Sequence, residues 1–137
     1  MATFVKFQDF VEQIGKEAHQ LATDTLKVYL TNATPSVSAD TVKADLAEIT
    51  AQNGYPSGGT DIQNGYTETD GTGTLTGTDV VFTASGGSFG PFRYVALYND
   101  TAANDELIAY WDYGSSISCN DGETFTVDFG ASILTLA

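Results

Sequence analysis

The feature that most constrains this chain is the regular alternation of short β-prone segments and turn residues over its second half. From Tyr66 onward, runs of β-branched, aromatic and alternating apolar residues are separated by glycine, asparagine and aspartate. The pattern predicts strands at 72–76, 79–84, 92–98, 107–113, 125–129 and 132–136. A spacing of about 8–12 residues between strands is typical of an antiparallel sandwich or barrel.

The connections in this half carry turn signals of different kinds. The glycine-rich stretch at 86–91 predicts a mobile connection before the strand at 92–98. Asn120-Asp121-Gly122 predicts a tight hairpin turn between Ile117 and Phe125. The segment 53–65, with two Asn-Gly pairs and Gly58-Gly59, predicts a loop.

The N-terminal segment has helical rather than strand periodicity. Its apolar residues recur at steps of three and four, at Phe4, Phe7, Val11, Ile14, Ala18 and Leu21, with Phe10 widening the stripe. This spacing predicts an amphipathic helix at 4–22 whose apolar face packs on a sheet or another subunit. Alternation at 26–31 then predicts a half-buried strand, and a further short helix is expected near 41–48.

These elements predict a single domain, residues 1–137, of the α+β class. We expect an antiparallel β-sandwich or barrel, jelly-roll-like, with one N-terminal amphipathic helix at 4–22 and residues 25–137 mainly β. The length suits one domain, and 42% apolar residues suffice for a packed core.

Aromatic residues crowd the two segments 92–98 and 107–113, which are apolar enough to be strands buried on both faces. Such rings suit a core, a subunit interface or a sugar-binding platform, and we favour core plus interface. The candidate packing or interface residues are Phe4, Phe7, Phe10, Val11, Ile14, Tyr94, Tyr98, Tyr110, Trp111 and Tyr113.

Charge limits the partners. The formal net charge is −13, with −3 in residues 1–50 and −10 in residues 51–137, where Arg93 is the only base. Direct binding to nucleic acid or to an anionic membrane is not expected, because both depend on lysine and arginine. A basic protein surface or a cation suits this charge.

Side chains that could perform chemistry are scarce. His19 is the only histidine and Cys119 the only cysteine, so a tetrahedral zinc site and an intrachain disulfide are not expected. We interpret His19 as a residue bordering the core or an interface, and Cys119 as a plain thiol. The turns at Asp70-Gly71 and Asp121-Gly122 lack the ligand spacing of an EF-hand calcium loop, and no phosphate-binding loop occurs in the sequence. We therefore predict no catalytic residues, no cofactor and no metal, and hence a protein that is not an enzyme.

Several blocks of the chain resemble a family of small virion structural proteins of tailed bacteriophages. The likeness begins at Phe10-Val11-Glu12 and continues through 24–32, 44–55, 90–94, 97–101, 106–110, 112–114 and 121–127. Within that group, we expect a capsid decoration (cement) protein. The resemblance carries no catalytic residues.

This resemblance implies a partner and a location. The partner would be the major capsid protein or another virion protein, and the chain would lie on the outer capsid surface after synthesis in the host cytoplasm. No membrane association is expected, because no signal peptide or spanning apolar run occurs. A homo-oligomer, dimer or trimer, is also expected, because the phenylalanine stripe and aromatic strands offer more apolar surface than one small sandwich needs.

Three other functions remain open at this stage. The chain could be a tail, baseplate or fibre-adaptor component of the same particle. It could be a carbohydrate-binding module that uses its tyrosine-rich strands, or an enzyme acting on a cell-surface glycan through paired carboxylates.

Overall fold

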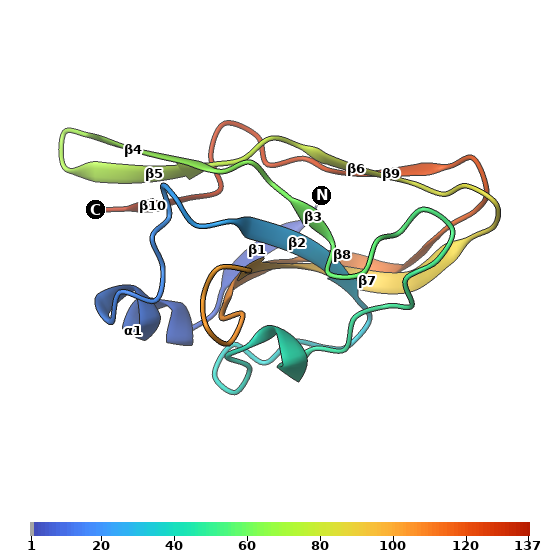
Figure 1. Ribbon diagram of the computed structural model, residues 1–137, viewed down its shortest axis with the longest axis horizontal. Coiled ribbons are helices and arrows are strands. Elements are labelled where there is room, and N and C mark those ends of the chain that lie inside the picture. The colour runs from blue at the N-terminus through green and yellow to red at the C-terminus, as the bar shows by residue number, and fades with distance from the viewer. Residues whose placement is uncertain (1) are drawn as a thin grey trace.

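The computed structural model describes residues 2–137, and its largest element is a five-stranded antiparallel sheet in the order β1-β8-β7-β2-β3 (Figure 1). The strands are β1 (Thr3–Lys6), β2 (Leu26–Thr31), β3 (Thr60–Asp61), β7 (Phe89–Asn99) and β8 (Leu107–Cys119). The long β7 and β8 strands form the centre of this sheet, with Val95 opposite Trp111 and Leu97 opposite Ala109.

A second layer covers one face of that sheet (Figure 1). It contains a three-stranded sheet, β10-β5-β4, and a two-stranded sheet, β6-β9. The strands are β4 (Gly65–Thr69), β5 (Thr72–Thr76), β6 (Val80–Thr83), β9 (Thr124–Val127) and β10 (Leu134–Leu136). A Cβ atom at Gly77, in the break between β5 and β6, would lie 3.0–3.2 Å from Ile133, Ile62 and Phe129. The break is therefore tightly packed.

The main hydrophobic core lies between the two layers. Leu26, Val28 and Leu30 alternate along β2 and are fully buried in it. Leu75 and Phe82 reach it from β5 and β6 of the second layer. Alternate positions on a strand share one face, so this pattern fixes which side of β2 meets the second layer.

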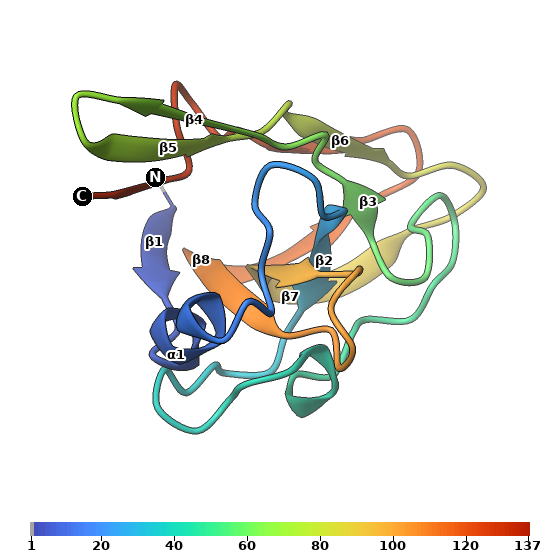
Figure 2. The same cartoon turned by 60° about the vertical axis from the view of Figure 1, so that its left-hand side comes forward.

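The opposite face of the five-stranded sheet is covered by residues 32–50, which include a 3₁₀ helix (Lys43–Asp45) (Figure 2). Helix α1 (Asp9–Gly15) lies beside this sheet, and its Phe10 and Ile14 contact the main core instead. A smaller apolar cluster lies beneath residues 32–50 and consists of Phe7, Tyr29, Leu46, Ala96, Tyr98 and Leu107. Both faces of β2 and β7 are therefore buried. The prediction that the strand at 26–31 is half-buried is wrong, because Tyr29 and Thr31 on its second face are also fully buried beneath residues 32–50.

The predicted α+β fold class, an antiparallel β-sandwich with one N-terminal helix, is confirmed. The strands predicted at 26–31 and 72–76 have those bounds, and those predicted at 79–84, 92–98, 107–113 and 132–136 each contain or overlap an observed strand. Within the short helix expected near 41–48, only the three-residue 3₁₀ helix forms.

The N-terminal helix is much shorter than the predicted range of 4–22. Residues 3–6 form β1 instead, where Phe4 and Val5 pair with Trp111 and Tyr110 of β8. Helix α1 ends at Gly15, and Glu17 then adopts a left-handed φ of 65°. A short isolated helix is only marginally stable, so pairing of residues 3–6 with the edge of β8 outweighs the helical spacing.

Three predicted connections also differ. The segment predicted as a loop at 53–65 contains β3 at 60–61 and ends at Gly65, the first residue of β4. Residues 89–91, expected in a mobile connection, belong to β7. The turn at 120–122 does form, with the Glu123 backbone N–H donating to the Asn120 carbonyl at 2.9 Å. It is not a hairpin, because β8 pairs with β1 and β7 whereas β9 pairs with β6. The turn therefore carries the chain from one layer to the other.

Candidate functional site

The structure divides the five candidate aromatic residues of β7 and β8 between the two faces of the sheet. Tyr94, Tyr98 and Tyr110 lie on the face covered by residues 32–50, and Tyr94 and Tyr98 are at most 5% exposed. Trp111 and Tyr113 lie on the opposite face and contact the main core. The tyrosine-rich strands therefore do not form one continuous surface platform.

The five candidates of the N-terminal segment are also separated. Phe7 and Phe10 are fully buried, but they belong to the smaller cluster and the main core respectively. Phe4 packs edge-to-face on Trp111 with ring centroids 5.5 Å apart, and Ile14 is partly buried. Val11 is 58% exposed. The apolar surface from which a homo-oligomer was predicted is thus largely used within the chain.

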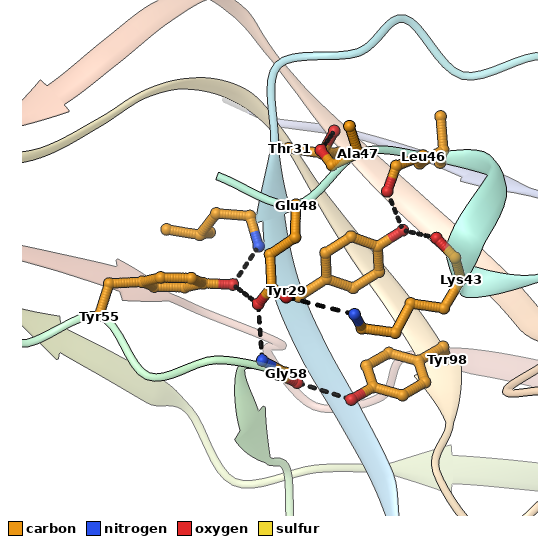
Figure 3. Close-up of polar contacts among 10 residues, drawn as sticks. Tyr29, Thr31, Lys43, Leu46, Ala47, Glu48, Tyr55, Gly58 and Tyr98 are labelled. Atoms are coloured by element: carbon orange, nitrogen blue, oxygen red, sulfur yellow. Dashed lines mark hydrogen bonds and ion pairs between the residues drawn. The ribbon is translucent and has the colours of Figure 1, made fainter. Parts of the chain in front are cut away.

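A network around Glu48 fastens two loops to the sheet (Figure 3). The Glu48 carboxylate accepts hydrogen bonds from the Tyr55 hydroxyl at 2.6 Å and the Gly58 backbone N–H at 2.7 Å. The Lys43 ammonium donates to its other oxygen at 3.2 Å. Charge-assisted hydrogen bonds of this kind are stronger than neutral ones. Glu48 therefore joins residues 43, 55 and 58, and sequence reasoning gave no signal for this role.

Two tyrosines complete this network by enclosing the Lys43 ammonium. Its Nζ lies 4.8 Å from the centroid of the Tyr29 ring and 5.5 Å from that of Tyr98 (Figure 3). The Tyr98 hydroxyl donates to the Gly58 carbonyl at 2.6 Å, and burial raises the pKa of both phenols. Cation–π attraction to the two rings and the negative charge of Glu48 together hold the Lys43 ammonium in a partly desolvated position.

The loop that carries Gly58 approaches β2 closely. Gly59 has a φ of +76°, and a Cβ atom there would lie 1.8 Å from the Val28 carbonyl oxygen. Only glycine fits that approach. The Gly58-Gly59 pair, a loop signal in the sequence, thus serves to seat the loop on the sheet.

A second polar cluster surrounds His19 beneath α1. The Asn99 side-chain amide donates to the Asp24 carboxylate at 2.7 Å and lies 3.1 Å from His19 Nδ1. The side-chain oxygen of Asn99, Oδ1, accepts hydrogen bonds from the backbone N–H groups of Thr101 and Ala102, and these bonds fix the orientation of the side-chain amide. In the neutral imidazole, Nδ1 therefore accepts, and the proton resides on Nε2.

His19 is 5% exposed, and its Nε2 has no protein partner within residues 2–137. Burial lowers the pKa of the imidazole, and the nearby carboxylates of Glu106, Asp24 and Asp9 oppose that shift. Protonation would place a charge on a buried ring and an N–H on Nδ1, facing the donor group of the Asn99 amide, so both burial and this contact disfavour it. His19 thus borders the core, as the sequence interpretation held, and is held there as a neutral ring.

This environment predicts that acidification destabilises the protein. The pKa of His19 is lower in the folded protein than in the unfolded chain, so the unfolded chain binds more protons as the pH falls. The contribution of His19 to the free energy of unfolding is therefore fully present above about pH 6.5 and is lost as the pH falls below that value. One histidine contributes at most about 1.4 kcal/mol per pH unit. Urea unfolding between about pH 7.5 and 5.5 should show this slope in the native protein and lose most of it in His19→Gln. Parallel slopes for the two proteins would contradict the assignment.

The remaining groups of chemical interest are engaged internally. Cys119 is 4% exposed, and burial, aided by Glu123, raises the pKa of its thiol. Arg93 donates to both oxygens of Asp112 at 2.9 and 3.1 Å, which lowers the pKa of that carboxyl. Within residues 2–137, no three His, Cys, Asp or Glu side chains are arranged to hold a metal ion.

A surface pocket opens beside Trp111, where β8 lies near β9 and the residues that follow it. Its volume is about 360 Å³, and its walls include Trp111, Tyr113 and Phe129 together with Thr126 and Asp128. Burial and the Asp128 charge raise the pKa of Tyr113 to about 12. Of the ten sequence candidates, Trp111 and Tyr113 line this pocket.

Comparison with known proteins finds no family model, no curated protein and no solved structure that matches this chain. The virion-protein resemblance therefore stays a prediction. Among the described residues, no helix has both the length and the apolar character needed to cross a membrane.

Proposed function

We propose that this protein is a non-enzymatic structural component of a tailed-bacteriophage particle, a capsid decoration protein that binds the outer surface of the head. The proposal that the protein is not an enzyme rests on the positions of three side chains that could take part in chemistry. His19, Cys119 and Arg93 are each buried or paired inside the chain. Acid–base and nucleophilic catalysis need such a group within reach of a substrate, and these three are engaged inside the chain.

The charge distribution supports a shell as the partner. Residues 51–137 carry a net charge of −10, and their only base, Arg93, is paired with Asp112. Such a surface favours basic patches on a protein and disfavours contact with packaged DNA. An exterior position on the head satisfies both conditions.

The sandwich also offers an arm for contact. The β4–β5 hairpin projects at the periphery of the second layer in both views (Figures 1 and 2). Among residues 2–137, strand β4 pairs only with β5, so its other edge is open. Thr67, Glu68 and Asp70, along this strand and at the hairpin tip, are exposed. Open edges and projecting hairpins are suited to pairing with another chain. Several copies bound in this way would bridge neighbouring capsomers and increase the buried area that holds them together.

The proposal predicts that the protein can be removed from particles and added back. Heads stripped of it should release DNA at a lower temperature, and re-addition should restore them at one fixed stoichiometry. Re-binding should slow as salt rises, because acidic and basic surfaces attract each other less when screened. An unrelated protein of similar net charge serves as the control and should restore nothing.

Two results would overturn this proposal. If stripped heads retain DNA as well as native heads do, the protein does not cement the shell. If antibody labelling places it only on the tail, the tail, baseplate or fibre-adaptor assignment replaces the head assignment. A dimer or trimer of the free protein stays a prediction and is not required for either placement.

A further inference from the structure

The pocket beside Trp111 has the dimensions of a small-molecule site. Its volume of about 360 Å³ lies within the range of about 300–1,000 Å³ that such sites occupy. Phe4 and Phe129 pack against the Trp111 ring, each with centroids 5.5 Å away, and Phe125 packs against Tyr113 at 5.1 Å. Neighbouring rings thus hold the Trp111 and Tyr113 side chains in place, so a ligand would not have to order them.

The chain itself shows which chemistry an aromatic and acidic site of this kind accommodates. Lys43 is held by the faces of Tyr29 and Tyr98 together with the Glu48 carboxylate. The Trp111 pocket has the same types of group, namely aromatic rings and a carboxylate, from Trp111, Tyr113 and Asp128. The pocket therefore has the types of group that bind a cation, and within residues 2–137 no lysine or arginine side chain of the protein lines it.

Charge decides between the classes of ligand that aromatic walls accept. The Asp128 carboxylate is exposed. Within residues 2–137, it accepts one hydrogen bond, from the Gly130 backbone N–H to Oδ1 at 2.8 Å. Residues 51–137 carry a net charge of −10, so the surrounding field repels anions and attracts cations. A neutral sugar would gain from the rings but not from this field.

From these observations, we infer that the Trp111 pocket binds an organic ammonium group, with the cation beside the aromatic rings and the Asp128 carboxylate. The ammonium group can come from a free quaternary amine or from a lysine side chain of another protein. This inference is independent of the proposed capsid function, because it concerns a ligand group that can be tested on the isolated protein.

The test uses the emission of Trp111, the only tryptophan of the chain. The intact protein is titrated at constant ionic strength with two cations, tetramethylammonium and N-acetyl-lysine methylamide. Two neutral compounds are titrated beside them: tert-butanol, which is similar in shape to tetramethylammonium, and a methyl glucoside. At least one of the two cations should give a saturable change with half-saturation in the millimolar range, as expected for one exposed cation–π site. Their relative affinities show whether the site prefers a quaternary or a lysine-type ammonium.

Two matched variants locate the effect. Asp128→Asn should raise the half-saturation concentration about three- to five-fold, since an exposed ion pair contributes up to about 1 kcal/mol. Asp61→Asn removes the same charge at an exposed position of β3, at the other end of the five-stranded sheet from β1 and β8, and should leave the titration unchanged. The inference is overturned if neither cation gives saturation, if tert-butanol or a methyl glucoside binds as well as the cations do, or if Asp128→Asn titrates like the native protein.

Discussion

Replacing Phe7 by alanine is expected to lower the free energy of unfolding by about 3–5 kcal/mol. Phe7 is fully buried and belongs to the cluster beneath residues 32–50, with its ring centroid 5.3 Å from that of Tyr110. Its backbone N–H also donates to the Ile108 carbonyl at 3.1 Å, and this bond should survive the substitution. The loss therefore arises from the cavity and the lost apolar contact, and urea unfolding measures it.

Val11→Ala is the matched control, because the sequence stripe predicted Phe7 and Val11 on the same buried face. Val11 is 58% exposed, so its truncation should cost less than about 0.5 kcal/mol. Similar losses for the two variants would mean that residues 4–22 pack as one helix, contrary to the structure.

The apolar residues of the N-terminal segment recur at steps of three and four for two different structural reasons. Phe4 and Phe7 flank the end of β1 and face different clusters, whereas Phe10 and Ile14 are one turn apart on α1 and both contact the main core. Spacing alone cannot distinguish one helix from a strand followed by a helix. The deciding factor is the edge of β8, with which residues 3–6 pair and which lies about a hundred residues away in sequence.

Strands buried on both faces were the most predictable part of the fold. The continuous apolar character of 92–98 and 107–113 indicated β7 and β8, and alternation at 26–31 gave the bounds of β2. Their partners could not be predicted, because pairing depends on distant segments. The Asn120-Asp121-Gly122 turn illustrates this limit, since a hairpin signal here joins strands of two different layers.

The polar sites were the least predictable part. Nothing in the sequence near Glu48 distinguishes it from Glu12, which forms an exposed ion pair with Lys16. Only the fold brings Glu48 to Tyr55 and Gly58, and only the fold places Trp111 and Tyr113 beside Asp128. Aromatic enrichment in β8 was the one sequence signal that indicated the pocket.

Replacing Glu48 by alanine is accordingly expected to lower the free energy of unfolding by about 2–4 kcal/mol, because its removal leaves polar partners unpaired. The Tyr55 hydroxyl and the Gly58 N–H would lose their acceptor, and the Lys43 ammonium would lie between two tyrosine rings without a counter-charge. The side chains of Lys43 and Glu48 are only 22% and 16% exposed, so water replaces these contacts incompletely.

Glu12→Ala provides the control, since it breaks the ion pair with Lys16, in which both side chains are more than half exposed, and should leave the free energy of unfolding nearly unchanged. Glu48→Gln should lie between the two, because an amide can still accept from Tyr55 or Gly58 but no longer neutralises Lys43. Hydrogen exchange should show the loss locally, with backbone amides of 43–59 exchanging faster in Glu48→Ala while those of β7 and β8 change less. Equal costs for Glu48→Ala and Glu12→Ala, or uniform acceleration over the whole chain, would show that Glu48 does not fasten these loops to the sheet.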